Sequence, residues 1–282
     1  MIGRRPDGYH DLVSLFQTID LHDTLRVSPS RELELVCADP GLTGPDDLVW
    51  RAALLLRQRA VTQQQARLDL DKGIPVAAGL GGGSADAAAA LLALNQLWGL
   101  GLTRATLSDL ASTLGADMPF FLTGGTALVQ GKGESIAPLP SAPPRWLLLL
   151  CPPLSLPRKT ASMYARLAPA LFDPGHTTRA AAAALAAGRF PGEDLLVNTF
   201  AKVADAAFPG LSAAREQVVR AAGGRPVHLS GSGPALFVLF EEPSEAEWAL
   251  ARMDSSVGRA YLARTGDWRC VPEEAVFPQE RP

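Results

Sequence analysis

The order of apolar and polar residues divides the first half of the chain into short strands and amphipathic helices. Alternation with a period of two indicates half-buried strands, whereas apolar residues at a spacing of three and four indicate one face of a helix. Strands are predicted over 12–19, over two segments of 24–37 joined near Pro29 and Ser30, and over 66–70. Helices are predicted over 48–59, 85–97 and 106–114. The strand pattern in 24–37 suggests an antiparallel sheet.

The second half of the chain is richer in helices. A hairpin is predicted over 124–134, a buried strand at the apolar run 146–151, and two further strands at 227–229 and 235–240. Helices are predicted to begin near Thr160 and to cover 178–187, 198–207, 212–222 and 244–253, the last with Ser244 and Glu247 spaced as a capping box. Beyond it, a Pro- and Glu-rich tail is expected to be peripheral. Strands and helices without a regular β-α-β rhythm predict an α+β fold.

The rest of the chain is organised around a glycine-rich loop that leads into a helix. Gly79, Gly81, Gly82 and Gly83 are followed directly by Ser84, which we expect to be the N-cap, and then by an Ala- and Leu-rich helix. Such a loop is either a tight connection or a phosphate-binding site, because uncapped N–H groups at a helix N-terminus attract anions. It is not a Walker A or a Rossmann loop, since the lysine of the first and the glycine spacing of the second are missing.

Three other positions have both a structural and a functional interpretation. Asp117, two residues before Pro119, is either the N-cap of a short helix or a carboxylate beside the glycine loop. A second glycine-rich loop over 229–234 is typical of a hairpin turn. Tyr9 and His10 stand at the start of a strand, where position alone favours a structural role. Sequence spacing does not decide between these alternatives.

Composition narrows the class of ligand. The 282 residues carry a formal net charge of −3 without a block of lysine or arginine, which argues against nucleic acid or an anionic membrane as partner and for a small molecule. Three separated cysteines offer neither a disulfide framework nor a metal-binding pair, and the four histidines lack the spacing of metal ligands, so we do not expect a structural zinc site. No apolar run is long enough for a membrane span and no signal peptide is recognisable, so we expect a cytoplasmic protein.

Several motifs together resemble the GHMP kinases. PVAAGLGGGSADAA resembles the second motif of that family, P-x-x-x-G-L-G-(G/S)-(G/S)-S, and LSGSGPALF resembles its third, glycine-rich motif. GRRPDGYHDLVSLFQTIDLHDTL, LGADMPFFLTGGTALVQGKGE and PRKTASMY are similar to the branch that phosphorylates a cytidine diphosphate-linked sugar alcohol on the non-mevalonate route to isoprenoids (terpenoids). The matches extend from Gly3 to Phe240 in the order of the family.

The resemblance implies a fold and its ligands. It implies an N-terminal ATP-binding domain over 1–143 with a left-handed β-α-β unit, a ferredoxin-like C-terminal domain over 144–282, and a site in the cleft between them. The implied phosphoryl donor is ATP with Mg²⁺, and the acceptor is the 2-hydroxyl of the sugar alcohol. The implied assembly is a monomer or a homodimer.

The resemblance also implies roles for individual residues. The triphosphate of ATP would be bound by Pro75, Gly79, Leu80, Gly81, Gly82, Gly83 and Ser84, with Ser84 contacting phosphate or Mg²⁺. Asp117 would be the catalytic base. The cytosine would be held by Tyr9, by His10 through hydrogen bonds, and by Tyr164 stacked on its other side, with Thr160 nearby. Gly231, Ser232 and Gly233 would close over the substrate near the reacting phosphate.

Two departures from the family pattern keep alternatives open. The family has a strand with Lys-x-Asn-Leu directly before G-R-R-x-D-G-Y-H, and this sequence begins after it; we therefore expect a start codon further upstream. Asp47 stands where the family usually has an asparagine near the adenine, and a carboxylate accepts but does not donate hydrogen bonds. The alternatives are another GHMP small-molecule kinase, acting on homoserine or mevalonate phosphate, and a catalytically inactive nucleotide-binding homologue.

Overall fold

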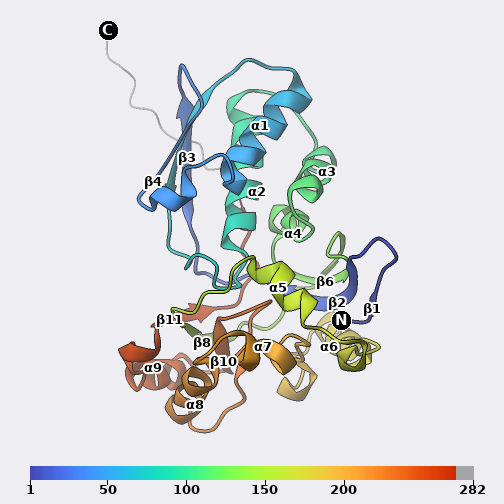
Figure 1. The fold of residues 1–282 in the computed structure, drawn as a ribbon, viewed down its shortest axis with the longest axis vertical. Coiled ribbons are helices and arrows are strands. Elements are labelled where there is room, and N and C mark those ends of the chain that lie inside the picture. Colours follow the sequence, from blue (N-terminus) through green and yellow to red (C-terminus); the bar gives the residue numbers. More distant parts are fainter. Residues whose placement is uncertain (271–282) are drawn as a thin grey trace.

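The computed structural model describes residues 1–270 as two lobes that lie one above the other along the longest axis (Figure 1). The sheet of the upper lobe has the order β3-β5-β4, with bounds β3 Thr24–Pro29, β4 Glu34–Cys37 and β5 Ala66–Asp71. β3 runs antiparallel to β5, as the sequence suggested, but β4 runs parallel to β5 and does not pair with β3. Since α1 (Leu48–Ala60) joins the parallel pair, these elements form the β-α-β unit that the family resemblance implied.

Helices cover one side of this sheet and enclose the first hydrophobic core. They are α1, α2 (Gly82–Leu97), α3 (Arg104–Leu114) and α4 (Met118–Thr123). The apolar stripe of α1 and the small alanines of α2 pack closely, and Leu56, Leu68 and Leu91 are fully buried between them. Burial of whole leucine side chains, each contributing about 2 kcal/mol, fixes α2 against the sheet. The loop that precedes α2 is thereby held on a rigid element.

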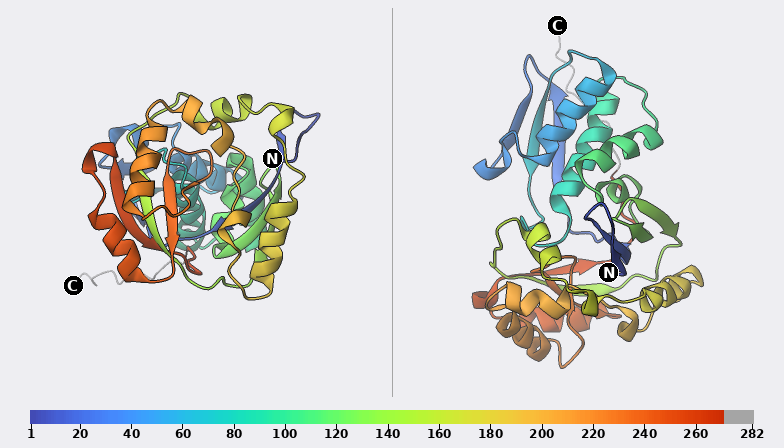
Figure 2. Two further views of the ribbon diagram at one scale, coloured as in Figure 1. Left: turned by 90° about the horizontal axis from the view of Figure 1, so that it is seen from below. Right: turned by 45° about the vertical axis from the view of Figure 1, so that its right-hand side comes forward.

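A second sheet lies between the lobes and begins at the N-terminus (Figure 2). Its order is β1-β2-β6-β7, with bounds β1 Gly3–Arg4, β2 His10–Gln17, β6 Thr126–Gly131 and β7 Ser135–Leu139. The turn at Pro6 and Gly8 joins β1 to β2, and Gly3 pairs with Asp11. β1 is only two residues long, too short for a periodic pattern in the sequence to predict. β6 and β7 form the predicted hairpin, but its second strand begins at Ser135, after the end of the predicted range 124–134.

The lower lobe has the ferredoxin-like arrangement that the resemblance implied. Its sheet has the order β11-β8-β10-β9, and every neighbouring pair is antiparallel. The bounds are β8 Trp146–Cys151, β9 His228–Leu229, β10 Leu236–Phe240 and β11 Arg259–Arg264. Helices connect the first strand to the second and the third to the fourth, which is the β-α-β-β-α-β pattern of that fold. The fully apolar β8 lies inside this sheet, as a continuous apolar run predicts.

Helices pack on the lower sheet and around its rim. They are α5 Lys159–Ala165, α7 Ala201–Ala207, α8 Leu211–Ala221 and α9 Pro243–Ala251, whereas α6 His176–Ala186 packs against β2 and β7 of the second sheet. Short 3-10 turns are η1 Pro40–Leu42, η2 Pro169–Leu171, η3 Glu193–Leu195 and η4 Ser255–Val257. The predicted capping box of Ser244 and Glu247 is wrong: Pro243 is already in the first turn, and no side chain caps the N-terminus of α9. Proline at that position starts the helix without a capping side chain.

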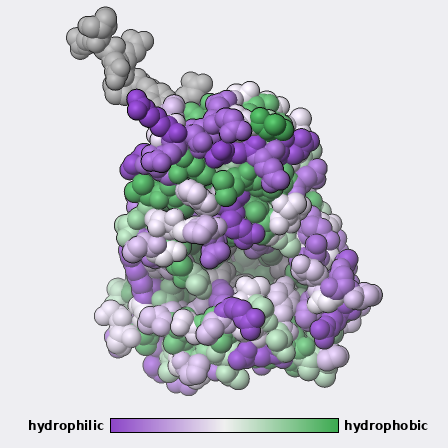
Figure 3. All heavy atoms as spheres, turned by 45° about the horizontal axis from the view of Figure 1, so that its top comes forward, coloured by the Kyte–Doolittle hydropathy of each residue, from purple (hydrophilic) through white to green (hydrophobic). Residues whose placement is uncertain are grey.

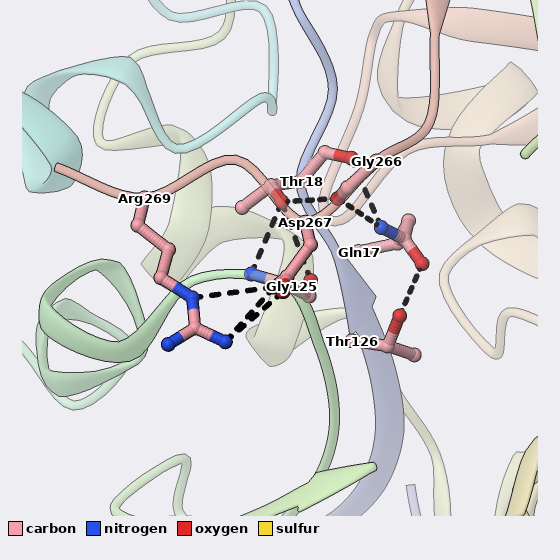
Figure 4. Close-up of polar contacts among 7 residues, drawn as sticks. All are labelled: Gln17, Thr18, Gly125, Thr126, Gly266, Asp267 and Arg269. Carbon is pink, nitrogen blue, oxygen red and sulfur yellow. Dashed lines mark hydrogen bonds and ion pairs between the residues drawn. The ribbon is translucent and has the colours of Figure 1, made fainter. Parts of the chain in front are cut away.

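The residues after β11 pack against the end of β2 and the start of β6 in the second sheet (Figure 4). The carbonyl oxygen of Gly266 accepts hydrogen bonds from Thr18 Oγ1 at 2.8 Å and Gln17 Nε2 at 2.9 Å, and Gly125 N donates to Trp268 O at 3.3 Å. The expectation of a peripheral tail after residue 253 is therefore wrong for residues 254–270, which also contain β11 of the lower sheet, and its remainder, 271–282, lies outside the described residues. A division at 143/144 stays a prediction. Within residues 1–270, no helix combines the length and the apolar character that crossing a membrane requires.

Candidate active site

The two glycine-rich loops, 150 residues apart in sequence, lie directly against each other. Ser230 Oγ donates a hydrogen bond to Gly79 O at 3.0 Å, and Ala235 N donates to Ala78 O at 2.9 Å. A Cβ atom on Gly79 would lie 2.6 Å from Gly233 O, so only glycine fits there. The second loop is the β9–β10 turn that the sequence predicted, and it packs directly against the first loop. Figure 3 shows the surface hollowed where the two lobes meet.

The residue at the N-cap of α2 differs from the one that the sequence predicted. Gly81, with φ of 74°, is the N-cap, and α2 begins at Gly82. Ser84 is therefore inside the first turn, and the prediction that it caps the helix is wrong. Since no side chain caps this helix end, the first-turn N–H groups are available to an anion. Phosphate is the anion that such a terminus binds best in combination with a glycine loop.

Asp117 lies at the start of a short helix and also beside the glycine loop, the two positions that the sequence left open. It occupies the N-cap position of α4, but its side chain makes no capping hydrogen bond. Instead, Asp117 Oδ1 accepts a hydrogen bond from Ser84 Oγ at 3.1 Å. The carboxylate thus lies at the phosphate-binding end of α2, where a reacting hydroxyl could be deprotonated.

Aromatic side chains from both lobes meet beside this carboxylate. The rings of His10 and Tyr164 have centroids 4.9 Å apart, and Tyr164 also contacts Phe200 at 5.0 Å. Burial lowers the pKa of His10, so its imidazole is neutral at pH 7 and can both donate and accept. Burial, reinforced by the negative charge of Asp117, raises the pKa of Tyr164 to about 12. The tyrosine hydroxyl therefore stays protonated near Asp117.

Tyr9 and Thr160, the other residues expected at the nucleobase, are both exposed to solvent. Tyr9 is 56% exposed, with Lys132 Nζ 4.9 Å above its ring, and Thr160 is exposed in the first turn of α5. Because the tilted rings of His10 and Tyr164 are already in contact, with centroids 4.9 Å apart, a cytosine does not fit between them in this arrangement. A cytosine between Tyr9 and Tyr164 remains a prediction.

Two residues that hold the glycine loops were missed by the sequence analysis. Asn198 Nδ2 donates to Leu229 O at 2.9 Å and to Gly231 O at 2.8 Å, and so fixes the second loop. Lys159 Nζ donates to Ala77 O at 2.9 Å and to Gly233 O at 2.6 Å, and so joins both loops. Asn198 was assigned to a helix that in fact begins at Ala201. Both side chains contact backbone that is distant in sequence, which a local pattern does not reveal.

A buried charge cluster supports the phosphate loop from below. Lys72 Nζ pairs with Asp86 Oδ2 at 2.7 Å and with Asp23, whose other oxygen accepts from Gly73 N and Ile74 N. Burial is the main cause that raises the pKa of Asp86 to about 7, and the neighbouring Asp23 charge adds to it. Burial acts to lower the pKa of Lys72, but its two carboxylate partners outweigh burial and raise it. The cluster ties β3, β5 and α2 together.

Comparison with known proteins identifies the family. The family models described as "GHMP kinases N terminal domain" and "GHMP kinases C terminal" match residues 47–125 and 179–260. The 4-diphosphocytidyl-2-C-methyl-D-erythritol kinase of Dehalococcoides mccartyi is 36% identical over 93% of this chain and 92% of its own length. The chain belongs to the 4-diphosphocytidyl-2-C-methyl-D-erythritol kinase family of GHMP kinases.

Further comparisons agree with membership of this kinase family. A relative of the same name from Xanthomonas euvesicatoria is 40% identical and covers 92% of this chain and 84% of its own. A crystal structure of 4-(cytidine 5'-diphospho)-2C-methyl-D-erythritol kinase superposes with a TM-score of 0.78 at 39% identity, covering 94% of each chain. A homoserine kinase from Cytophaga hutchinsonii, at 18% identity and a TM-score of 0.69, shares the fold alone. The α+β two-lobe fold and the kinase activity expected from sequence are therefore confirmed.

Few side chains at the phosphate loop could hold a magnesium ion. Among residues 1–270, no group of three or more His, Cys, Asp or Glu side chains is placed to hold a metal. Mg²⁺ in kinases is held by few protein oxygens together with substrate phosphates, and the Ser84 hydroxyl beside Asp117 offers oxygens of that kind. The donor set fits Mg²⁺ that arrives with a nucleotide.

The unusual Asp47 of this kinase family member has a clear structural role. Its side chain caps α1 by accepting from Val49 N at 2.7 Å, and burial raises its pKa. Capping needs only an acceptor, which aspartate supplies as well as asparagine. Its contacts to adenine stay a prediction.

Proposed function

We propose that this chain transfers the γ-phosphoryl group of ATP to the 2-hydroxyl of 4-diphosphocytidyl-2-C-methyl-D-erythritol, a reaction that supplies isoprenoid precursors. The hydrogen bond from Ser84 Oγ to Asp117 Oδ1 carries the proposal, since it sets a carboxylate at the end of a phosphate-binding helix. The names of the full-length relatives support the choice of acceptor. Cytoplasmic location and a monomeric or homodimeric state belong to the same proposal.

The first loop and the first turn of α2 bind the triphosphate of ATP in this proposal. Backbone N–H groups of Gly82, Gly83 and Ser84 hydrogen-bond phosphate oxygens without needing a lysine in the loop. They are fixed before the reaction, so they stabilise the charge of the transition state without reorganising. Gly79 and Gly231 allow the second loop to lie close against the first and cover the same phosphates.

The acceptor enters from the side of the aromatic residues. Neutral His10 hydrogen-bonds the edge of the cytosine, while Tyr164 and Tyr9 contact its faces, each stacked base contributing about 1 to 3 kcal/mol. The acceptor then extends towards Asp117, which lies close enough to Tyr164 to influence its pKa. This arrangement selects a cytidine-linked acceptor over a small amino acid or acid.

Phosphoryl transfer asks the protein mainly to position two groups and to offset charge. Asp117 accepts the proton of the 2-hydroxyl as its oxygen bonds to the γ-phosphorus, and the bond from that phosphorus to the bridging oxygen of ADP breaks. Mg²⁺ held by the Ser84 hydroxyl and the phosphates would neutralise charge on the transferring group. Asp117 afterwards releases the proton to water.

A phosphoryl-transfer assay tests this proposal against its alternatives. The chain is incubated with ATP, Mg²⁺ and either 4-diphosphocytidyl-2-C-methyl-D-erythritol, homoserine or mevalonate phosphate, and products are identified by mass spectrometry. ATP binding is measured separately by calorimetry. We expect a phosphorylated product with the cytidine-linked acceptor alone. Transfer to another acceptor would favour a different GHMP kinase, and ATP binding without any transfer would favour an inactive homologue.

A further inference from the structure

Lys159 lies where the two glycine loops meet, and its contacts are unusual for a lysine. Its ammonium donates to Ala77 O at 2.9 Å and to Gly233 O at 2.6 Å, one carbonyl from each loop. An ammonium has three N–H donors, so these two bonds leave one for another partner. The position is fixed by the start of α5, whose later turn carries Tyr164.

The charge of Lys159 has no counter-charge among the described residues. Within residues 1–270, none of the ion pairs involves this side chain, and both of its hydrogen-bond partners are neutral carbonyl oxygens. Burial alone lowers the pKa of Lys159 to about 8, with no contribution from a charged neighbour. A partly buried ammonium without an anion is unfavourable, and a bound anion would remove that cost.

The backbone around Lys159 is held in conformations that L-residues rarely adopt. Within residues 1–270, the non-glycine residues with positive φ are Val61, Ala77 and Arg158. Ala77, at 58°, carries one of the carbonyls that Lys159 contacts, and Arg158, at 46°, directly precedes Lys159. Such strain costs about 1 kcal/mol or more per residue and is concentrated at binding and catalytic sites. The surrounding structure therefore enforces this position of the ammonium.

We propose that Lys159 is a phosphate-contacting residue of the site, held by the carbonyl oxygens of Ala77 and Gly233 so that its third N–H and its charge meet a phosphate oxygen bound between the two loops. The inference rests on the proposed function, since it requires that these loops bind phosphorylated ligands. Two sources supply the same chemistry: the triphosphate of ATP and the diphosphate of the acceptor. The glycine-rich loop offers only uncharged backbone donors, so the ammonium of Lys159 supplies the positive charge that neutralises the phosphate.

Calorimetric proton uptake tests this contact independently of turnover. ATP and, for the acceptor side, cytidine diphosphate are titrated into the protein at pH 8.5 in buffers of different ionisation enthalpy. With a free-state pKa of about 8, Lys159 is mostly neutral at this pH, and a phosphate contact should drive uptake of roughly 0.7 proton per ligand. The ligand that causes uptake identifies which phosphate is contacted.

Variants distinguish the contact from a merely structural role. Lys159→Met should abolish the uptake and weaken binding of that ligand about 10- to 100-fold, the usual range for a lost charge-assisted hydrogen bond. Lys159→Arg should retain most of the affinity yet also abolish the uptake, because a guanidinium stays charged at pH 8.5. Lys202→Met is the matched control, since Lys202 also donates to a carbonyl, Leu171 O, outside the site. It should change neither quantity.

Each outcome decides between the two proposals. If ATP and cytidine diphosphate bind to the unmodified protein without proton uptake, and Lys159→Met leaves both affinities unchanged, the lysine proposal is overturned while the kinase assignment stands. If neither nucleotide binds to the unmodified protein, the proposed function fails as well. Uptake with either nucleotide that Lys159→Met removes supports the contact.

Discussion

Charged side chains on the two sides of the phosphate loop are arranged in opposite ways. Beneath α2, the ammonium of Lys72 is shared by the carboxylates of Asp23 and Asp86, and all three side chains are largely buried. On the open side, Asp117 has a hydroxyl partner and Lys159 has two carbonyl partners. No ion pair in the described part of the chain includes either of them. The charges of Lys72, Asp23 and Asp86 are therefore balanced within the protein. The charges of Asp117 and Lys159 have no partner of opposite charge among the described residues and are available to a ligand.

This difference predicts which charged residues stabilise the fold and which take part in binding or catalysis. Breaking a compensated buried cluster leaves a charge without a partner, so it should lower the stability of the fold. Removing an uncompensated charge relieves an unfavourable burial, so it should change binding or turnover and leave stability nearly intact. The changes below test that division, from the largest expected effect to the smallest.

The substitution Asp117→Asn should have the largest effect on turnover. It removes the proton acceptor while keeping the shape and the hydrogen bond to Ser84, so kcat should fall about 100- to 10,000-fold. ATP affinity and the urea midpoint should change little. Steady-state kinetics and calorimetry measure these quantities, and unchanged turnover would remove Asp117 from the mechanism.

The substitution Lys72→Met should have the largest effect on stability. It leaves the carboxylates of Asp23 and Asp86 buried together, and we expect a loss of about 3 kcal/mol in the free energy of unfolding. Urea denaturation measures this loss. The control Lys202→Met, on an exposed face of α7, should stay within about 0.5 kcal/mol of the unmodified protein. Equal losses for the two substitutions would show that the buried charge cluster does not contribute to the free energy of unfolding.

Two glycines of the same loop should respond differently to alanine. A Cβ on Gly79 would meet the backbone oxygens of Gly233 and Ser230 at 2.6 and 2.8 Å, whereas a Cβ on Gly83 would meet only Leu48 at 3.6 Å. Gly79→Ala should therefore separate the loops, destabilise the fold by about 1 to 3 kcal/mol and weaken ATP binding. Gly83→Ala, inside α2, should preserve or raise stability. The reverse order would contradict the docking of the two loops.

The smallest expected effect is a change in how stability depends on pH. The pKa of Asp86 is about 7 in the folded protein, against its ordinary value of 3.8, so between these values the folded state binds more protons than the unfolded state. This group's contribution to stability is therefore fully present at low pH and is lost as pH rises to about 7. Asp86→Asn cannot ionise, so the difference in stability between the variant and the unmodified protein should shift in favour of the variant as pH rises from 5 to 7.5 in urea titrations. A stability difference between the two proteins that stays constant over that range would show that Asp86 is already ionised at pH 5.

Local sequence patterns predicted the elements well and the contacts between them poorly. The helix over 48–59 and the apolar strand at 146–151 depend on neighbours in sequence, so the periodicity of apolar residues was sufficient. Ser84 was assigned to the wrong position because Gly81, with positive φ, begins the helix without a capping side chain. The choice between cap and carboxylate at Asp117 needed its distance to Ser84, which only the packing of α2 against α4 provides.

The family resemblance supplied what local patterns lacked, but only for residues within its motifs. It placed both glycine loops and Asp117 at one site, as the structure does. It gave no role to Lys72, Lys159 or Asn198, whose partners lie 14 to 82 residues away along the chain. Their contacts form only when separate elements pack, so neither composition nor spacing could reveal them.

The most direct test of the central claim is to follow the γ-phosphoryl group itself. Phosphorus NMR of a reaction containing ATP, Mg²⁺ and 4-diphosphocytidyl-2-C-methyl-D-erythritol distinguishes a new phosphomonoester on the acceptor from free phosphate. The account predicts one acceptor phosphomonoester at the 2-position for every ADP formed, and none with Asp117→Asn on the same timescale. ADP formed with free phosphate alone, or an acceptor that stays unmodified while ATP is bound, would contradict it.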